Sequence, residues 1–195
     1  MKPPLDTVRR EYVTRYASLR VPADRQAEIA AIVQRITQHR ARYEEVSRAS
    51  KNALSSGVPW QVIGVIHSLE CDGRFDQHLH NGDPLARPTV NEPAHLPTNW
   101  LRLPADQRTW EASALDALAY DHFLTWHDWS LPGALYMLEA YNGWGYRSHD
   151  CPTPYLWAAT QHYTAGKYIA DGRFDPTAVS KQIGAAPLLQ SLGFC

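Results

Sequence analysis

Cysteine is scarce in this sequence, and its placement excludes the common cysteine motifs. The chain has 195 residues and three cysteines, Cys71, Cys151 and Cys195, an odd number with no CxxC pair. This spacing excludes a zinc ribbon and a thioredoxin-like redox motif. We therefore expect reduced cysteines, although one disulfide would be compatible with the spacing if the protein acts outside the cytoplasm.

Long apolar runs and an excess of charge are also missing. No stretch approaches the roughly 18 consecutive apolar residues of a membrane-spanning helix, and the first residues lack the apolar core of a signal peptide. The net charge is only −1, whereas binding to phosphate backbones requires a basic surface. We expect a monomer with no membrane span and no nucleic-acid partner.

Several catalytic motifs are absent as well. The sequence has no G-x-S-x-G elbow, no P-loop and no HExxH. Cys71 has no histidine arrangement that would make it a protease nucleophile. These absences argue against a hydrolase with a serine or cysteine nucleophile. Nothing in the sequence indicates a cofactor.

Helical periodicity dominates what is present. Apolar residues recur at three- and four-residue steps, and Pro or Ser residues stand where helices begin. Residues 72–105 are rich in proline and polar residues, so we expect irregular structure there, with a short hairpin turning at 81–82. The predicted helices are 6–19, 23–50, 59–70, 108–123, 131–141, 154–165 and 176–192. The fold class is mainly α, in a single domain 1–195, with N-terminal helices over 1–50 and a small β-hairpin or loop insertion after helix 59–70.

The pentapeptide Asp-Gly-Arg-Phe-Asp occurs twice, at 72–76 and at 171–175. The flanking residues differ, so we interpret it as one turn-plus-anchor solution used twice rather than as a repeat.

Glu70 is the first candidate catalytic residue. It closes the apolar run 58–69 and stands before the polar loop. The last turn of a helix carries partial negative charge, and an apolar floor is poorly solvated. Both effects favour a protonated carboxyl, which suits a general acid, although a solvated glutamate at a helix end is the more common occurrence.

A glycosidase that uses two carboxylates needs a second one across the scissile bond. Asp72, Asp76 and Asp83 follow Glu70 in the loop, and a turn at 81–82 could bring Asp83 back over the helix end. We therefore predict Glu70 and Asp83 as the catalytic pair.

His78, His80 and Asp83 offer a rival hypothesis, a zinc or iron site in a metal-dependent amidase or peptidase. The set is incomplete, and histidines that bond to carbonyls and brace the loop explain the pattern better. We predict no metal site.

A second polar and aromatic cluster lies at 139–146, Glu-Ala-Tyr-Asn-Gly-Trp-Gly-Tyr. Its amide, phenol and indole groups are suited to holding sugars by stacking and hydrogen bonding. A helix C-cap explains the same residues and is compatible with that role.

Four blocks of this sequence resemble the phage-type endolysins and bacterial lysozyme-family proteins of the lysozyme-like superfamily. The blocks are 58–70, Phe75 with His-Leu-His-Asn-Gly-Asp-Pro-Leu at 78–85, 128–147, and 154–168, and the resemblance covers about 55–190. It implies a lysozyme-like helical domain that cleaves the β-1,4 bond between N-acetylmuramic acid and N-acetylglucosamine in peptidoglycan, with Glu70 as the general acid.

The subtype is open at this stage. Lysozyme-like muramidases use a second group across the cleft, whereas lytic transglycosylases rely on the substrate acetamido group. Glu70 is followed by Cys71 rather than by the serine usual in soluble transglycosylases, but Ala140–Asn142 is similar to their Ala-Tyr-Asn motif. The predicted substrate-binding residues are His78, His80, Asn81, Tyr141, Asn142, Trp144 and Tyr146.

We expect the partner to be peptidoglycan glycan strands. The protein would be made in the cytoplasm without a signal peptide and would act on the cell wall after holin-type or other export. A non-catalytic glycan-binding or secretion-accessory module is the alternative from another class.

Overall fold

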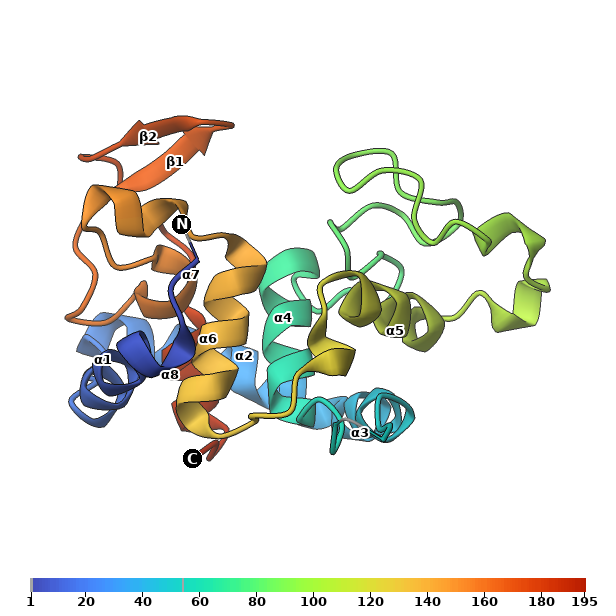
Figure 1. The fold of residues 1–195 in the computed structure, drawn as a ribbon, viewed down its shortest axis with the longest axis horizontal. Coiled ribbons are helices and arrows are strands. Elements are labelled where there is room, and N and C mark those ends of the chain that lie inside the picture. Colours follow the sequence, from blue (N-terminus) through green and yellow to red (C-terminus); the bar gives the residue numbers. More distant parts are fainter. Residues whose placement is uncertain (1, 54) are drawn as a thin grey trace. The chain divides into compact units, whose positions relative to one another are not determined.

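The computed structural model describes residues 2–53 and 55–195, and they form two compact units (Figure 1). Unit 1 combines the N-terminal segment up to Gln34 with Asp128–Cys195, and unit 2 is Arg35–His127. The prediction of one domain stays a prediction. Within the described residues, none of the helices combines the length and apolar character needed to cross a membrane.

Both units are mainly helical, as the sequence predicted. The α-helices are α1 Leu5–Ala17, α2 Gln26–Gln38, α3 Arg40–Ala49, α4 Trp60–Cys71, α5 Trp110–Tyr120, α6 Leu131–Asn142, α7 Pro154–Trp157 and α8 Ala185–Ser191. Short 3₁₀ turns lie at Ala23–Arg25, Trp100–Arg102, Ala105–Gln107, Phe123–Thr125 and Gly145–His149. One antiparallel sheet pairs β1 Lys167–Ala170 with β2 Arg173–Asp175.

Unit 2 is organised around the apolar helix α4. Pro59 precedes its first turn, and residues 62–67 are fully buried against α3 and neighbouring side chains. Around the middle of α4, the rings of Tyr43, His67, Phe75 and Trp110 form an aromatic cluster with centroids 4.4–5.9 Å apart. The long segment from α4 to α5, green in Figure 1, contains only turns and short 3₁₀ helices.

Unit 1 packs α1 and α7 against α6, whose residues 132–139 are buried. Ser130 is the N-cap of α6 with Pro132 in its first turn, as predicted, although the Ser130 hydroxyl donates to Asp128 and accepts no capping bond from a helix N–H. The hairpin β1–β2 packs on the 3₁₀ turn after α6 through Phe174 and Tyr146, with ring centroids 6.1 Å apart.

The predicted helix 23–50 is interrupted at His39. His39 stands between α2 and α3, and its ring packs edge-on against Phe75 at 4.8 Å. A tertiary contact therefore breaks a continuous helical pattern that contains neither Gly nor Pro to signal the break.

The predicted helices near the C-terminus are too long. Helix 154–165 reduces to the single turn α7, because Ala158 is extended and Ala159 has a positive φ of 60°. The segment 176–184 is not helical, because the Asp175 carboxylate accepts hydrogen bonds from Thr177 and Ala178 and holds a local turn instead.

The prediction of a β-hairpin that turns at 81–82 is also wrong, because the residues on either side do not form a pair of strands. Only an isolated bridge, Gln77–Pro84, flanks that turn, and the sheet of this chain lies at 167–175. The bridge still folds the loop back on itself, so the turn itself lies where the sequence placed it.

The two copies of the pentapeptide adopt the predicted turn-plus-anchor form. Gly73 and Gly172 have positive φ angles of 71° and 65°. The following phenylalanines anchor each turn, with Phe75 packed in the aromatic cluster and Phe174 stacked on His149 at 3.8 Å.

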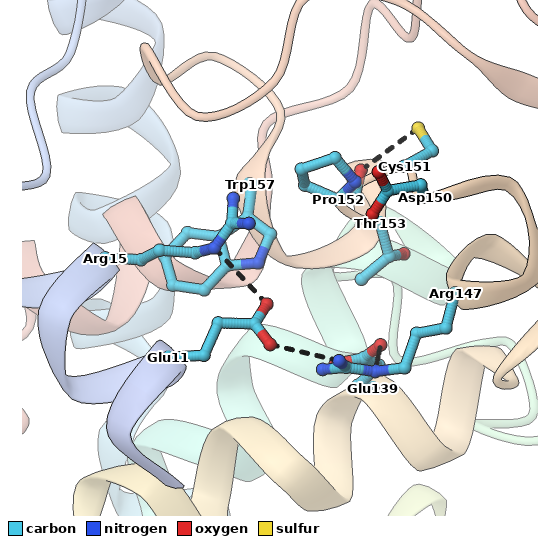
Figure 2. Close-up of a pocket in the computed structure, with 9 residues that line it drawn as sticks. All are labelled: Glu11, Arg15, Glu139, Arg147, Asp150, Cys151, Pro152, Thr153 and Trp157. Carbon is cyan, nitrogen blue, oxygen red and sulfur yellow. Dashed lines mark hydrogen bonds and ion pairs between the residues drawn. The ribbon is translucent and has the colours of Figure 1, made fainter. Parts of the chain in front are cut away.

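A buried ion pair connects α1, α6 and the turn after α6 in unit 1. Glu139 is only 3% exposed and accepts two 2.7 Å bonds from Arg147 and a 2.6 Å bond from the Tyr12 hydroxyl. Arg147 also pairs with Glu11 at 3.1 Å (Figure 2). The buried carboxylate is thereby fully compensated.

Arg147→Gln should lower the free energy of unfolding by about 3 to 5 kcal/mol, because Glu139 would remain buried without its cation. Tyr12→Phe removes one hydrogen bond to the Glu139 carboxylate and keeps the ion pair, so its cost should be smaller, about 1.5 to 3 kcal/mol. Urea unfolding followed by circular dichroism measures both values. If both variants lost the same free energy of unfolding, the Glu139–Arg147 ion pair would not be the main stabilising interaction of this group.

Candidate functional site

Glu70 lies one residue before the C-terminal end of α4 and is half-buried. The helix ends at Asp72, which adopts the left-handed conformation with φ 49°. Val65 and Ile66, in the preceding turn, are fully buried. The structure thus places a partly exposed glutamate in the last turn of a helix whose preceding residues are buried.

The turn at Asn81–Gly82 lies directly over the backbone of Glu70. A Cβ atom on Gly82 would be 3.0 Å from the Glu70 carbonyl oxygen, and Gly82 has a positive φ of 78°. A side chain at this position would both crowd the helix end and strain the turn. Glu70 and the loop 76–85 therefore form one local site within unit 2.

Cys71 fastens the same loop to the helix. It is buried, and its thiol donates to the carbonyl oxygen of His78 at 3.2 Å. Burial, together with the charge of Glu70, raises the pKa of the Cys71 thiol to about 12. Cys71 is therefore a protonated structural group and not a nucleophile.

Asp83, the predicted second catalytic residue, is buried inside the loop. Its carboxylate accepts bonds from the backbone N–H groups of Val90 and Asn91 at 2.7 and 2.9 Å, and from the side-chain amides of Asn91 and Asn81 at 2.6 and 3.3 Å. Burial alone would raise the pKa of Asp83, but these bonds outweigh it and lower that pKa. The surroundings favour a role in holding 81–91 together.

The other two aspartates after Glu70 are exposed. Asp72 pairs with Arg35 at 3.1 Å, and Asp76 pairs with Arg74 at 3.2 Å. The Arg74 guanidinium lowers the pKa of Asp76 through hydrogen bonding and charge. Each of the three aspartates considered as a partner of Glu70 is therefore bound to groups of its own neighbourhood.

His78 braces the loop from within. Its Nε2 lies 2.8 Å from the Arg87 carbonyl oxygen and must carry the proton, while Nδ1 lies 2.7 Å from the Ser113 hydroxyl and accepts. Burial lowers the pKa of His78 and keeps it neutral. Both ring nitrogens are used, so His78 has no lone pair left for a metal or a sugar.

His80 makes a different contact. Its Nε2 lies 3.0 Å from a carboxylate oxygen of Asp116 on α5, and its Nδ1 is buried without a hydrogen-bond partner among the described residues. Asp121, five residues after Asp116 and just past the end of α5, interacts electrostatically with His80, and burial raises the pKa of Asp121 to about 6. Sequence reasoning did not select Asp116 or Asp121, because neither stands in a motif.

In the part of the chain that the structure describes, no three His, Cys, Asp or Glu side chains are arranged to hold a metal ion. His78, His80 and Asp83 are therefore not gathered into a metal site.

The predicted sugar-binding residues of 141–146 belong to unit 1 and separate into two groups. Asn142 and Tyr146 line an open hollow of about 660 Å³ together with Tyr168 and Ile169 of β1. Tyr141 instead pairs with Tyr155, and Trp144 packs on Tyr136 with ring centroids 4.9 Å apart. The volume is within the usual range of roughly 300–1,000 Å³ for ligand pockets.

The hollow combines apolar and polar groups. Ile169 is 45% exposed, and the hydroxyl of Tyr168 packs over Gly145, where a side chain would not fit. The Tyr146 hydroxyl accepts from the Tyr168 backbone N–H at 3.3 Å, and the Asn142 amide donates to Thr153 at 3.1 Å. Tyr168 and Ile169 were missed by the sequence analysis because 165–175 was not predicted to be a hairpin.

Comparisons of this chain with protein-family models, with curated proteins and with solved structures give no match.

His67 supports the same loop from the middle of α4, and its titration gives a test. Its Nε2 donates to the Arg74 carbonyl at 3.1 Å, and its Nδ1 accepts from the Tyr43 hydroxyl at 2.9 Å. Burial lowers the pKa of His67 from 6.5 to about 4.

Because the unfolded state binds the proton first, the stability contributed by neutral His67 should be complete above pH 6.5 and lost as the pH falls toward 4, by about 3 kcal/mol. His67→Gln removes this titration while keeping an amide N–H. Urea unfolding between about pH 7 and pH 4 should show a weaker pH dependence for the variant. Parallel curves for the two proteins would contradict the assignment.

Proposed function

We propose that this protein is a peptidoglycan-degrading glycosidase of the lysozyme-like type, which cleaves the β-1,4 bond between N-acetylmuramic acid and N-acetylglucosamine. The observation that carries the proposal is Glu70, a half-buried carboxyl at the end of α4, under the Asn81–Gly82 turn of a loop fixed to that helix. Glu70 acts as the general acid and protonates the leaving glycosidic oxygen.

The environment of Glu70 suits an acid. The C-terminal carbonyl groups of α4 disfavour negative charge nearby, and the buried residues before Glu70 exclude water from one side. Partial exposure leaves the carboxyl accessible to a substrate. Cys71, His67 and His78 each bond to a backbone carbonyl of the loop that follows Glu70, so this loop is fixed to α4.

The aspartates near Glu70 bear on what assists Glu70 once the glycosidic oxygen is protonated. Asp83 receives four hydrogen bonds, and Asp72 and Asp76 each pair with an arginine. These commitments favour the second candidate function, a lytic transglycosylase, in which the substrate acetamido group assists Glu70 and no second carboxylate is required. Asp83 then acts by keeping Asn81 and Gly82 in place.

Glycan binding is assigned to the hollow in unit 1. Tyr168 and Ile169 offer apolar surface for a pyranose ring, and Asn142 and Tyr146 offer polar groups for acetamido and hydroxyl substituents. Peptidoglycan would be reached after holin-type or other export, with the protein acting as a monomer.

Glu70→Gln should abolish the loss of turbidity of cell-wall suspensions, with a decrease of at least about 100-fold, because the amide cannot donate the catalytic proton. Asp76→Asn is the matched control: its carboxylate is exposed and paired only with Arg74, and its activity should stay within about twofold. Circular dichroism verifies both folds. Full activity of a folded Glu70→Gln variant would overturn the assignment.

The products distinguish the two subtypes. Mass spectrometry of muropeptides released by the wild-type protein should show 1,6-anhydro ends if the acetamido group assists Glu70, and reducing ends if water attacks directly. We expect anhydro ends because the neighbouring aspartates are committed elsewhere. Binding to purified sacculi with no soluble product would instead identify a non-catalytic glycan-binding module.

A further inference from the structure

The dipeptide Asn-Gly occurs twice in this chain, at 81–82 and at 142–143. In such a dipeptide the backbone nitrogen of the glycine can attack the side-chain amide carbon of the asparagine, because glycine has no side chain that hinders the approach. The nitrogen gives its proton to solvent base, a new C–N bond closes a succinimide ring, and the bond to the amide nitrogen breaks with release of ammonia. Water then opens the ring and leaves aspartate or isoaspartate. The backbone around the dipeptide must rearrange for the ring to close.

The Asn81 side chain is held by several hydrogen bonds. Its amide oxygen accepts from the Asp83 backbone N–H at 3.0 Å. Its amide nitrogen donates to the Asp83 carboxylate at 3.3 Å and to the Asn91 carbonyl oxygen at 2.8 Å. The amide carbon that would be attacked is therefore fixed within the loop.

The attacking nitrogen of Gly82 is also held. Its N–H donates to the His78 carbonyl oxygen at 2.9 Å. The glycine itself lies so close to α4 that a Cβ atom there would be 3.0 Å from the Glu70 carbonyl oxygen. Closing a succinimide at 81–82 would require the loop to leave the end of α4.

The second dipeptide, Asn142–Gly143, stands in open surroundings. Asn142 is the last residue of α6 and is exposed. Its amide nitrogen donates to the Thr153 hydroxyl at 3.1 Å, and its amide oxygen has no partner among the described residues. Gly143 has φ 94° and ψ 154°, a conformation that is nearly confined to glycine, and a Cβ atom there would have no neighbour within 4 Å.

The attacking nitrogen of Gly143 bonds within the last turn of its own helix. Its N–H donates to the Ala140 carbonyl oxygen at 3.1 Å. The end of a helix frays readily, because no further turn follows to hold it. The buried residues of α6 end at Glu139, so opening this bond frees the nitrogen while the packed part of the helix stays in place.

We infer that Asn142 is a deamidation site of this protein, and that Asn81, in the same dipeptide, is protected by the loop that holds it. Deamidation replaces an amide that donates to Thr153 by a carboxylate. It thereby adds a negative charge to the lining of the hollow in unit 1, which would repel anionic ligands. The inference does not depend on the proposed glycosidase activity, because the reaction needs only water.

The test incubates the full-length protein at mildly alkaline pH and follows both Asn-Gly peptides by mass spectrometry after digestion at acidic pH. The peptide with Asn142 should gain the mass that replacement of NH2 by OH gives. The peptide with Asn81 should react at least about tenfold more slowly, because its loop must first open. In urea, where the chain is unfolded, the two peptides should react at similar rates.

Two variants separate the reaction at Asn142 from other changes. Asn142→Gln keeps an amide but would have to close a larger ring, so the mass gain in this peptide should disappear. Gly143→Ala should slow the gain at least about tenfold, because a Cβ atom hinders the nitrogen and disfavours the positive φ. Circular dichroism verifies that both variants fold.

Two outcomes would overturn the inference. The first is a reaction at Asn81 as fast as that at Asn142 in the folded protein. The second is no mass gain at Asn142 in the folded protein under conditions in which the unfolded chain reacts at both positions.

Discussion

The polar loop after α4 depends on neutral histidines buried in the helical scaffold. A loop without regular secondary structure satisfies only part of its backbone by its own hydrogen bonds, and each buried carbonyl without a donor is costly. His67 donates to the carbonyl of Arg74, and His78 donates to that of Arg87. In each ring the second nitrogen accepts from a hydroxyl, Tyr43 or Ser113, which fixes the tautomer. Burial keeps both rings neutral, so the helices hold the loop without charge.

This arrangement determines where Glu70 can act. Cys71 donates to the His78 carbonyl, and Gly82 lies against the Glu70 carbonyl, so the loop that follows Glu70 is held against the end of α4. Asp83 lies inside the loop and accepts hydrogen bonds from Val90 and Asn91. These bonds hold the loop together where no strand pairing does so. Asp83 and His78, which look functional in the sequence, thus support the loop.

The sequence predicted the elements whose signals are local. The limits of α4 and α6 follow from apolar runs with Pro59 and Ser130 at their starts, and the two pentapeptides form their turns because glycine permits a positive φ. The break at His39 could not be predicted, because its cause is a contact with Phe75, 36 positions away in the chain. The hairpin at 167–175 was missed for a similar reason, since Tyr168 and Phe174 pack on Tyr146 in the turn after α6, which is distant in the sequence.

The site was predictable to the same extent. The position of Glu70 before a polar loop and the bracing by His78 follow from residue type and spacing, whereas the partners of Glu139 do not. Tyr12 lies 127 positions before Glu139, and nothing in either segment indicates the other.

Glu70 and Glu139 show that the same position in a helix can give two carboxyl groups different surroundings. Both stand near the end of an apolar helix and precede a polar segment. Glu139 is 3% exposed and receives three bonds from Arg147 and Tyr12, and burial together with the charge of Glu139 raises the pKa of Tyr12. Glu70 is instead partly exposed at the end of α4, beside the neutral thiol of Cys71. Two glutamates at similar places in the sequence thus have different surroundings, because their partners come from distant parts of the chain.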